Sequence, residues 1–394
     1  MRLLAFPLLL ACTRTPPADT TGSTDSDTDD VIVETTPPVA VRFATFNVSL
    51  YRNGLGQLAT DLSDPSLEQG VFIGNIIGEV DPDVILLNEL DYDAAGDAVA
   101  ALQANFFAET YPHVYIAPSN TGVASGHDLD NDGSTAGPED AFGFGEFPGQ
   151  YAFAVLSKYE LGTPRTYQNF LWKDLPDAWL PDGWFSAEEL EVVRLSSKNH
   201  VDLPVIIGDT TVHFLVSHPT PPTFDGAEDR NGRRNHDEIA FWTQYVDADA
   251  DAWPVDDAGT QGGLDGASFV IAGDLNADPD DGDSSGDGID ALLAHARVQD
   301  QPAPSSLGGT EQSGIQGNIN AQHRGDPAHD TADFNDASVG NLRLDYVLPS
   351  TDLAIEESGV FWPEAADSAF EWVGTFPFPA SDHRLVWVEL SIPQ

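Results

Sequence analysis

The chain has 394 residues, of which 41% are hydrophobic and 10% aromatic, enough apolar surface for a substantial core, so composition excludes a disordered polyanion. It carries 65 Asp and Glu against 16 Lys and Arg, and the formal charge of −49 argues against an electrostatic grip on DNA, RNA or an anionic membrane. A saline habitat and a surface that binds divalent cations both account for this acidity, and the sequence does not decide between them.

The first 12 residues, MRLLAFPLLLAC, resemble a bacterial lipoprotein signal that ends at its lipidated cysteine. Cys12 is the single cysteine of the chain, which excludes an intrachain disulfide. Because the apolar run is short, a plain secretory signal is the alternative. Residues 13–38 form a low-complexity Thr/Asp/Pro tether. We therefore expect an exported monomer, an outer-membrane or cell-surface lipoprotein or otherwise a secreted or periplasmic protein, that meets the membrane only through its lipid anchor.

From residue 39 to residue 394, short β-rich runs alternate with helical patterns, which predicts a single α/β domain. Helix 66–80 places Ile73, Ile76, Ile77 and Val80 on one face. The other predicted helices cover 95–109 and 235–246, with Asp237 and Glu238 in the first turn of the latter, where acidic residues favour the helix dipole. The predicted strands cover 41–48, 83–90, 151–158, 201–207, 210–218, 268–276, 342–349 and 383–390. Loops are expected at 120–148, 163–190, 249–266 and 299–340.

Polar residues follow or end several of these apolar strands. For any one of them a cap or turn role is the simpler interpretation, but the repetition indicates a shared site. Carboxylates supply the hard oxygen ligands that Mg²⁺ prefers, and imidazoles transfer protons near neutral pH. The residues concerned are Asn47, Glu89, His218, Asp274, Asn276, Asp345, Asp382 and His383.

The motifs TFN, DPDVILLNE, SH, GDLN, RLDYVL and SDHR occur in this order over residues 41–390. This order resembles that of the endonuclease/exonuclease/phosphatase superfamily, which has the DNase I-like fold. The resemblance implies a four-layer α/β/β/α sandwich in which two mixed sheets lie face to face with helices outside. It also implies hydrolysis of phosphate esters with Mg²⁺ or a similar ion such as Mn²⁺.

The resemblance also assigns roles by position. Glu89 resembles the principal metal ligand, with Asn47 beside it and Asp382 near the metal. Asp274 and Asn276 resemble the residues that orient the nucleophile and hold the scissile phosphate. Asp345 and His383 resemble the pair that acts on the attacking water, and His218 resembles the imidazole that contacts a phosphate oxygen. Asn88 replaces the usual Gln, and Ser49 stands where some branches place a second acidic ligand, so one or two catalytic metals remain open.

Cations are concentrated soon after His218. Arg230, Arg233 and Arg234 lie in a stretch that we expect to form a loop along the rim of the site, where forked hydrogen bonds would hold the substrate phosphate. Arg194, together with Lys198, is expected to add to the same positive pocket. The alternative is that the first three arginines pair with Glu228, Asp229 and Asp237 on a solvated surface.

Residues 128–139 match the spacing of a calcium-binding loop. Gly133 stands at the sharp turn, but no clear flanking helices are predicted. The expected structural Ca²⁺ ligands are Asp128, Asp130, Asp132, Ser134 and Glu139, and a merely acidic loop is the alternative.

These features predict an exported, divalent-metal-dependent phosphoesterase that uses His and Asp to assist attack by water. The substrate is a phosphorylated small molecule, a phospholipid or a nucleic acid, and the negative charge favours a small substrate over long duplex DNA. A secreted nuclease is one alternative. An alternative of another class is a non-catalytic calcium-binding or adhesive module on the same fold.

Overall fold

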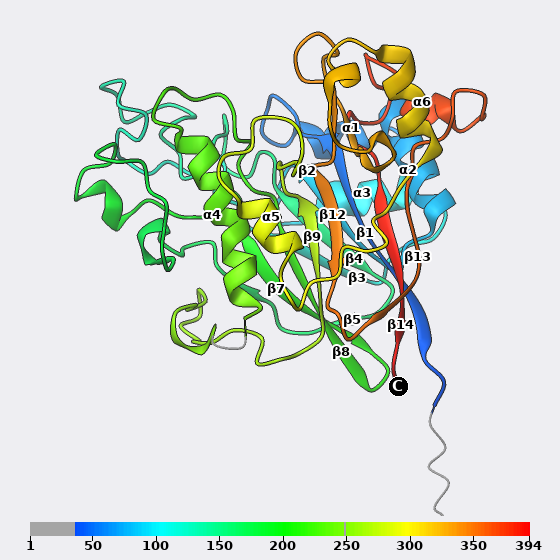
Figure 1. Cartoon of the computed structure of the whole chain (residues 1–394), viewed down its shortest axis with the longest axis horizontal. Helices are drawn as coiled ribbons and strands as arrows, with labels where there is room; N and C mark the ends of the chain where they lie inside the picture. The colour runs from blue at the N-terminus through cyan, green and yellow to red at the C-terminus, as the bar shows by residue number, and fades with distance from the viewer. Residues whose placement is uncertain (1–35, 248–249) are drawn as a thin grey trace, which may run out of the picture. The chain divides into compact units, whose positions relative to one another are not determined.

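Two mixed β-sheets form the centre of the protein in the computed structural model, which describes residues 36–247 and 250–394 (Figure 1). The first sheet has the order β13-β14-β1-β2-β4-β3, and the second has the order β12-β9-β8-β7-β5, with β6 pairing with β7. The strands of the first sheet are β1 (Val39–Leu50), β2 (Val84–Leu90), β3 (His113–Ala117), β4 (Phe153–Ser157), β13 (Ala354–Val360) and β14 (Val386–Ile392). Those of the second are β5 (Glu160–Leu161), β6 (Arg165–Thr166), β7 (His200–Ile207), β8 (Thr210–Ser217), β9 (Phe269–Asp274) and β12 (Asp345–Pro349). A separate pair joins β10 (Ala332–Asp333) to β11 (Asn341–Leu342).

The two sheets pack face to face through apolar side chains. Phe43 of β1 meets Phe214 of β8 with ring centroids 5.5 Å apart. Residues 43–48 of β1 are buried on both faces, because one face packs on the second sheet and the other on helices. This two-sided burial explains why the central strands read as continuous apolar runs.

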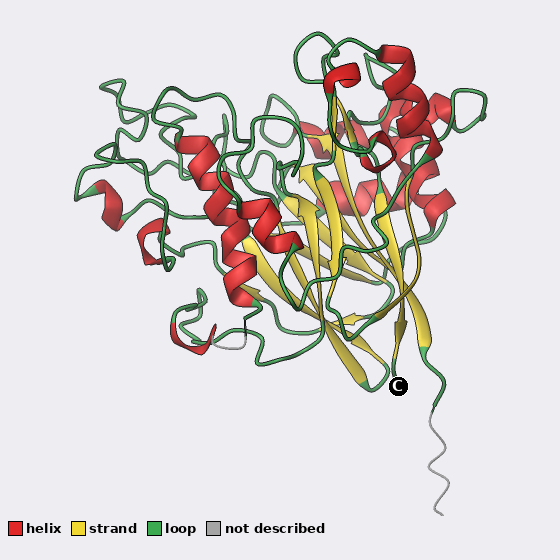
Figure 2. Ribbon diagram, viewed as in Figure 1, coloured by secondary structure: helices red, strands yellow, loops and turns green. Residues whose placement is uncertain are grey.

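Helices cover the outer face of each sheet (Figure 2). The predicted face of α2 is confirmed, since Ile73, Ile76, Ile77 and Val80 are buried in the same core as β1 and β2. Ile239 and Trp242 of α4 pack against the strands of the second sheet. The predicted four-layer α/β/β/α sandwich is therefore confirmed. The helices are α1 (Gln57–Leu62), α2 (Glu68–Val80), α3 (Asp97–Phe106), α4 (Arg230–Tyr245), α5 (Gly288–Leu293), α6 (Leu307–Gln316) and α7 (Phe370–Val373), with short 3-10 turns η1 (Trp172–Asp174), η2 (Glu189–Glu191), η3 (Ala250–Ala252), η4 (Asn320–Gln322) and η5 (Pro327–His329).

Helices α4 and α6 both differ from the sequence predictions. Helix α4 begins at Arg230 rather than at 235, so the three arginines lie on a helix and not on a loop. Asp237 and Glu238 consequently lie inside α4, buried, and not in its first turn. Helix α6 occupies part of the predicted loop 299–340. Its glycines weaken the helical pattern, while Ser306 caps it by accepting a hydrogen bond from the Gly309 amide at 3.0 Å.

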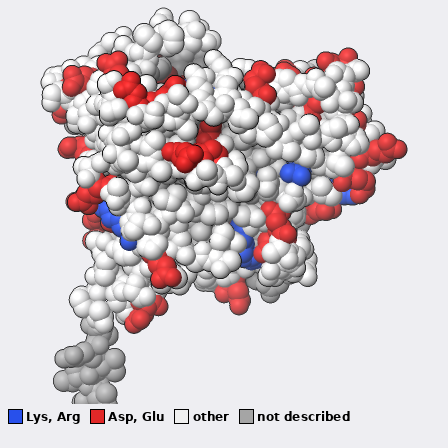
Figure 3. Space-filling view, turned by 180° about the vertical axis from the view of Figure 1, so that it is seen from behind, with Lys and Arg blue, Asp and Glu red and all other residues white. Residues whose placement is uncertain are grey.

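Acidic side chains spread over the face seen from behind, where Lys and Arg appear at few places (Figure 3). Residues 37–394 form one compact unit. The signal-like segment, Cys12 and the tether up to residue 35 lie outside the described residues. In the part of the chain that the structure describes, every helix is too short or too polar to cross a bilayer.

Candidate active site

Strand pairing in the second sheet brings three of the predicted residues together. Strand β8 runs parallel to β9, with Val216 opposite Ala272, so His218 and Asp274 lie at the same edge of the sheet. Strand β12 runs antiparallel to β9 and starts with Asp345 opposite Asp274. Sheet register alone therefore explains how residues far apart in sequence meet.

The first sheet supplies its polar residues at the matching edge. Strands β1 and β2 are parallel with Asn47 opposite Asn88, which places Glu89 one residue further along. The Asn47 side-chain amide donates a 3.0 Å hydrogen bond to Asp274 Oδ2 and so links the two sheets. Ser381 Oγ donates to the Asn47 carbonyl at 2.7 Å, which brings the turn containing Asp382 and His383 to the same place.

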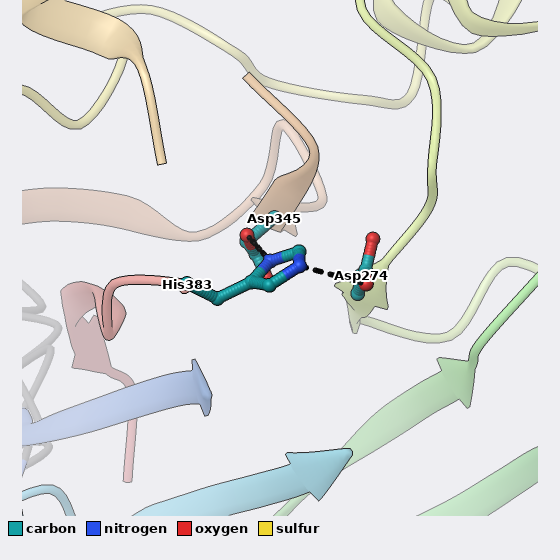
Figure 4. Close-up of side chains that lie close together, drawn as sticks. All are labelled: Asp274, Asp345 and His383. Atoms are coloured by element: carbon teal, nitrogen blue, oxygen red, sulfur yellow. Dashed lines mark hydrogen bonds and ion pairs between the residues drawn. The ribbon is translucent and has the colours of Figure 1, made fainter. Parts of the chain in front are cut away.

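His383 lies between two aspartates at the centre of the site (Figure 4). Its Nδ1 is 2.8 Å from Asp345 Oδ2, and its Nε2 is 3.7 Å from Asp274 Oδ2. Thr331 Oγ1 donates to Asp345 Oδ2 at 2.8 Å, accepts a hydrogen bond from the Asp345 amide at 3.0 Å and so fixes the orientation of the carboxylate. Thr331 had no signal in the sequence, because its partner is set by the path of the chain through β10 and β12.

The two histidines of the site are held in opposite charge states. Burial alone lowers the pKa of His383, but the negative charges of Asp345 and Asp274 outweigh it and raise the pKa well above its usual value. Burial, together with the positive charges of Lys198 and His383, lowers the pKa of His218 well below its usual value. His218 Nε2 lies 3.5 Å from Asp274 Oδ2. At neutral pH, His383 is therefore an imidazolium and His218 is neutral.

Asp274 sits between these two rings and is 1% exposed. Burial raises the pKa of Asp274 to about 6, opposed by the charge of His383. Asn276 follows it in the left-handed region, with φ of 52°, and its amide N–H donates to Asp274 Oδ1 at 3.0 Å. The Asn276 side chain donates to the Pro219 carbonyl at 3.1 Å, next to His218.

Glu89 and Asp382 place two carboxylates close to each other on the open side of the cluster. Burial, followed by the charge of Asp382, raises the pKa of Glu89 to about 7. Ser49 Oγ donates to Asp382 Oδ1 at 2.8 Å, and Ser49 N–H donates to Asn47 Oδ1 at 3.1 Å. Two crowded carboxylates supply the hard oxygen donors that Mg²⁺ and Mn²⁺ favour, and a divalent cation would offset their repulsion. Asn47 directs its side-chain N–H toward Asp274 and its Oδ1 toward the Ser49 amide, so it assists from beside the carboxylates. These residues therefore fit a catalytic metal ion.

A second set of ligand atoms, from Asp274, Asp345 and His383, also lies close enough to hold a metal ion. In this set Nδ1 of His383 is bonded to Asp345, which leaves Nε2, 3.7 Å from Asp274 Oδ2, as the free ring nitrogen. The negative charges of both aspartates also favour a proton on this ring, so the trio is suited to proton handling as well.

The site opens into a cleft of about 640 Å³. Glu89, His218, Asp382 and Lys198 line it, whereas Asp274, Asp345 and His383 are not among its lining residues and lie deeper. The cleft thus presents the metal side of the site to an entering substrate.

The four predicted phosphate-binding arginines have different environments. Arg194, Arg230 and Arg234 line the cleft, but Arg233 does not: it stacks on Trp179 at 4.9 Å and donates to the Leu180 carbonyl. Within residues 36–247 and 250–394, none of the four forms an ion pair with a carboxylate, so the alternative of surface pairing with Glu228, Asp229 and Asp237 is wrong.

Arg234 joins separate loops and has few donors left for a substrate. Its guanidinium donates to the carbonyls of Leu195, Phe142 and Arg194 at 2.6–2.8 Å. Burial lowers the pKa of Arg234 to about 10, so the group stays charged at neutral pH. Its role is to hold the wall of the cleft.

Glu238 of α4 is a site residue that the sequence did not reveal. It is fully buried, and it accepts hydrogen bonds from the amides of Ser197 at 2.7 Å and Thr220 at 2.6 Å. These amides flank Lys198 and His218, so Glu238 fixes both segments against α4. A carboxylate inside a helix carries no sequence signal for such a role, because both partners lie on other segments.

The acidic loop gathers a different ligand set from the one expected. One carboxylate oxygen from each of Asp128, Asp130 and Asp140 lies close enough to the other two for the three to hold one ion, whereas Glu139 lines the cleft. Asp132 and Gly133 donate backbone N–H groups to Asp128 and Asp130, which closes the loop around its own carboxylates. Ser134 Oγ makes a turn with Ala136. The loop thus has Asp140 in place of Glu139, and the binding of Ca²⁺ stays a prediction.

The raised pKa values of Glu89 and Asp274 predict how a cation stabilises the protein. Both carboxyl groups have a higher pKa in the folded protein than in the unfolded chain. Their contribution to the free energy of unfolding is therefore present at low pH and is lost as the pH rises through about 7. Millimolar Mg²⁺ should therefore raise the melting temperature, relative to EDTA, more at about pH 8 than at about pH 5. Glu89→Gln should lose most of this difference, and Asp130→Asn, in the acidic loop, should keep it. An equal Mg²⁺ shift at both pH values would contradict the assignment.

Most of the chain is similar to proteins of one known family. Residues 44–383 match the model of the Endonuclease/Exonuclease/phosphatase family. No curated protein sequence matches the chain. Among solved structures, an endonuclease/exonuclease/phosphatase from Beutenbergia cavernae is similar at 17% identity and TM-score 0.48, covering 90% of this chain and 72% of that one. Sphingomyelinase C from Streptomyces griseocarneus is similar at 16% identity and TM-score 0.45, covering 89% and 99%.

A mannosyl-6-phosphatase from Bacteroides thetaiotaomicron is similar at 12% identity and TM-score 0.46, covering 89% of this chain and 100% of that one. The match to the family model extends over most of the chain and includes every strand that carries a site residue. The chain belongs to the endonuclease/exonuclease/phosphatase family.

Proposed function

We propose that this protein is an exported, divalent-metal-dependent phosphoesterase that hydrolyses phosphodiester or phosphomonoester bonds. The observation that carries the proposal is the convergence of Asp345, His383, Asp274 and His218 at the shared edge of two sheets, with Glu89 beside them. Such a set combines a positive donor, a weakly basic carboxylate and a neutral imidazole within a few ångströms.

The opposite charge states of His383 and His218 give the two rings different roles in the proposed reaction. A protonated His383, held by Asp345, stabilises negative charge on the phosphoryl oxygens and does not accept a proton. Asp274, with a pKa of about 6, orients the attacking water and accepts its proton. Neutral His218 is positioned to donate a hydrogen bond to a phosphate oxygen. This changes the role inferred from the family resemblance, in which the His383 pair acted on the water.

The cation is assigned to the carboxylates of Glu89 and Asp382, with Asn47 beside them. When bound there, Mg²⁺ or Mn²⁺ would polarise the phosphate and offset the charge that develops on it. We also propose Ca²⁺ as a structural ion for Asp128, Asp130 and Asp140.

A small phosphate ester is the preferred substrate. The net charge of −49 repels a polyanion at long range, so local cations must reverse the potential at the cleft. Arg194, Arg230 and Lys198 line it and supply that charge. A phospholipid headgroup and a nucleic acid share the same phosphate chemistry and are tested as alternatives.

The expected export and lipidation at Cys12 belong to this proposal and rest on the sequence of the first 38 residues. The monomeric state is a separate expectation. A non-catalytic module is disfavoured, because burying Asp274, Asp345 and His383 together is costly and a merely structural protein has no need for it.

The first test is a substrate panel comprising a phosphomonoester, a small phosphodiester, plasmid DNA and a phospholipid, assayed with Mg²⁺, Mn²⁺, Ca²⁺ or EDTA. We expect turnover of a small ester with Mg²⁺ or Mn²⁺ and none in EDTA, while Ca²⁺ raises the melting temperature through the acidic loop. His383→Ala and Asp274→Asn should lower kcat by roughly 10²–10⁴-fold without unfolding the protein. His295→Ala, which alters a histidine outside the cleft, is the matched control. Plasmid as the best substrate would identify a nuclease, and no turnover in any arm would refute the proposal.

The second test compares arginines that line the cleft with one that lies outside it. Arg194→Ala or Arg230→Ala should lower kcat/KM by roughly ten- to a hundredfold, which is the contribution of one charge-assisted hydrogen bond. Arg233→Ala removes the same charge from the same region but outside the cleft, so it should leave kcat/KM nearly unchanged. Equal losses in all three variants would show that net charge, and not contact, controls the rate.

A further inference from the structure

The wall of the cleft away from the catalytic residues is aromatic. Its rings come from segments that lie outside the sheets, and two of them are exposed at the mouth: Phe144 is 51% exposed and Phe224 is 87% exposed. The aromatic side chains of this wall are Phe142, Phe144, Trp172, Phe185 and Phe224. Exposed aromatic rings contribute no buried apolar area to the core. Beside a cleft, such rings indicate a binding surface.

The part of this wall around Phe142 is held in place before any ligand arrives. The Arg194 guanidinium lies 3.9 Å from the centre of the Phe142 ring, and Arg234 donates to the Phe142 carbonyl at 2.6 Å. Arg230 and Trp184 both donate to the carbonyl of Leu129, at 2.7 Å and 2.9 Å. A preformed wall lowers the entropic cost of binding, so a rigid ligand of matching shape is favoured.

The polar groups of the same wall narrow the ligand further. Glu139, which is exposed, and Asn231 both line the cleft. An acyl chain would desolvate these groups without offering a hydrogen bond, at a cost of a few kcal/mol per group. The edge of a heteroaromatic ring would pair with them while its faces stack on the phenyl rings.

Charge and size agree with a ligand that joins such a ring to a phosphate. Arg194 and Arg230 line the same cleft as the aromatic wall and Glu89, with Arg194 against the Phe142 ring, and within residues 36–247 and 250–394 neither forms an ion pair. A volume of about 640 Å³ is in the range of small-molecule sites, roughly 300–1,000 Å³, and far below what duplex DNA needs.

We propose that this wall is a subsite for a planar aromatic group, so that the substrate is a monomeric phosphate ester with an aromatic ring, either a nucleobase or a simpler aryl group, on its alcohol. This inference rests on the proposed phosphoesterase activity, because only that activity would make the bound ester a substrate. The binding of the aromatic ring can be tested separately.

The experiment compares wild type, Phe144→Ala/Phe224→Ala and the control Phe376→Ala. Phe376 is 85% exposed but does not line the cleft, so its loss controls for removing a surface ring. The esters are benzyl methyl phosphate, cyclohexylmethyl methyl phosphate, octyl methyl phosphate and the methyl ester of thymidine 5′-phosphate. All four carry the same charge and differ only in the group offered to the wall.

We expect the wild type to have the lowest KM for the two aromatic esters. The double variant should raise that KM by roughly tenfold, the contribution of one stacking contact, with little change in kcat. It should raise the KM for the cyclohexyl and octyl esters by clearly less, because these groups lose only apolar contact area and no ring stacking, and Phe376→Ala should behave as wild type. A lower KM for thymidine than for benzyl would identify the nucleobase as the source of the ring.

Binding is measured separately, by calorimetry with benzyl phosphonate and octyl phosphonate, which are not hydrolysed. Selective binding of the benzyl compound that is lost in the double variant supports the subsite, even if no ester is turned over and the phosphoesterase proposal fails. Turnover of all four esters with one common KM in wild type and double variant would overturn the subsite and leave the phosphoesterase intact. Preference for the octyl compounds would overturn it in favour of a lipid.

Discussion

The site depends on one buried arrangement, in which Asp274 lies between the charged ring of His383 and the neutral ring of His218. Placing two imidazoles and two carboxylates in one buried volume is costly unless their charges compensate. Here the compensation comes from Asp345, which neutralises His383, and from Asn47, which donates to Asp274 across the gap between the sheets. The two sheets are therefore joined at this edge by polar contacts as well as by apolar packing.

Some of the few cations of this acidic chain hold its turns and loops in place. Arg384, which is fully buried, donates to the carbonyls of Ser381 and His383 and so holds the turn that presents His383. Arg234 holds the cleft wall in the same way. A guanidinium satisfies several carbonyls at once, and this allows long loops without regular structure to form a fixed surface. The acidic side chains of the remaining surface therefore surround a cleft that is itself lined by several basic side chains.

Much of the catalytic set could be predicted from sequence, because it rests on a local signal. Polar residues at the ends of apolar strands predict a shared sheet edge, and the register of β8, β9 and β12 confirms this for His218, Asp274 and Asp345. Contacts between distant segments have no such signal, which explains why Thr331 and Glu238 were not found. The arginines were placed on a loop because no cap marks the start of α4, whose N-cap, Asp229, makes no side-chain cap hydrogen bond.

The most direct measurement is an NMR titration of the imidazole nitrogens in histidine-labelled protein. We expect His383 to stay an imidazolium at pH values well above the usual histidine pKa of about 6.5, and His218 to stay neutral at pH values well below it. Asp345→Asn should bring the titration of His383 back toward the usual range, with the fold retained. If both rings titrate together near pH 6.5, the charged arrangement around Asp274 does not exist, and the proposed division of roles between the two histidines is wrong.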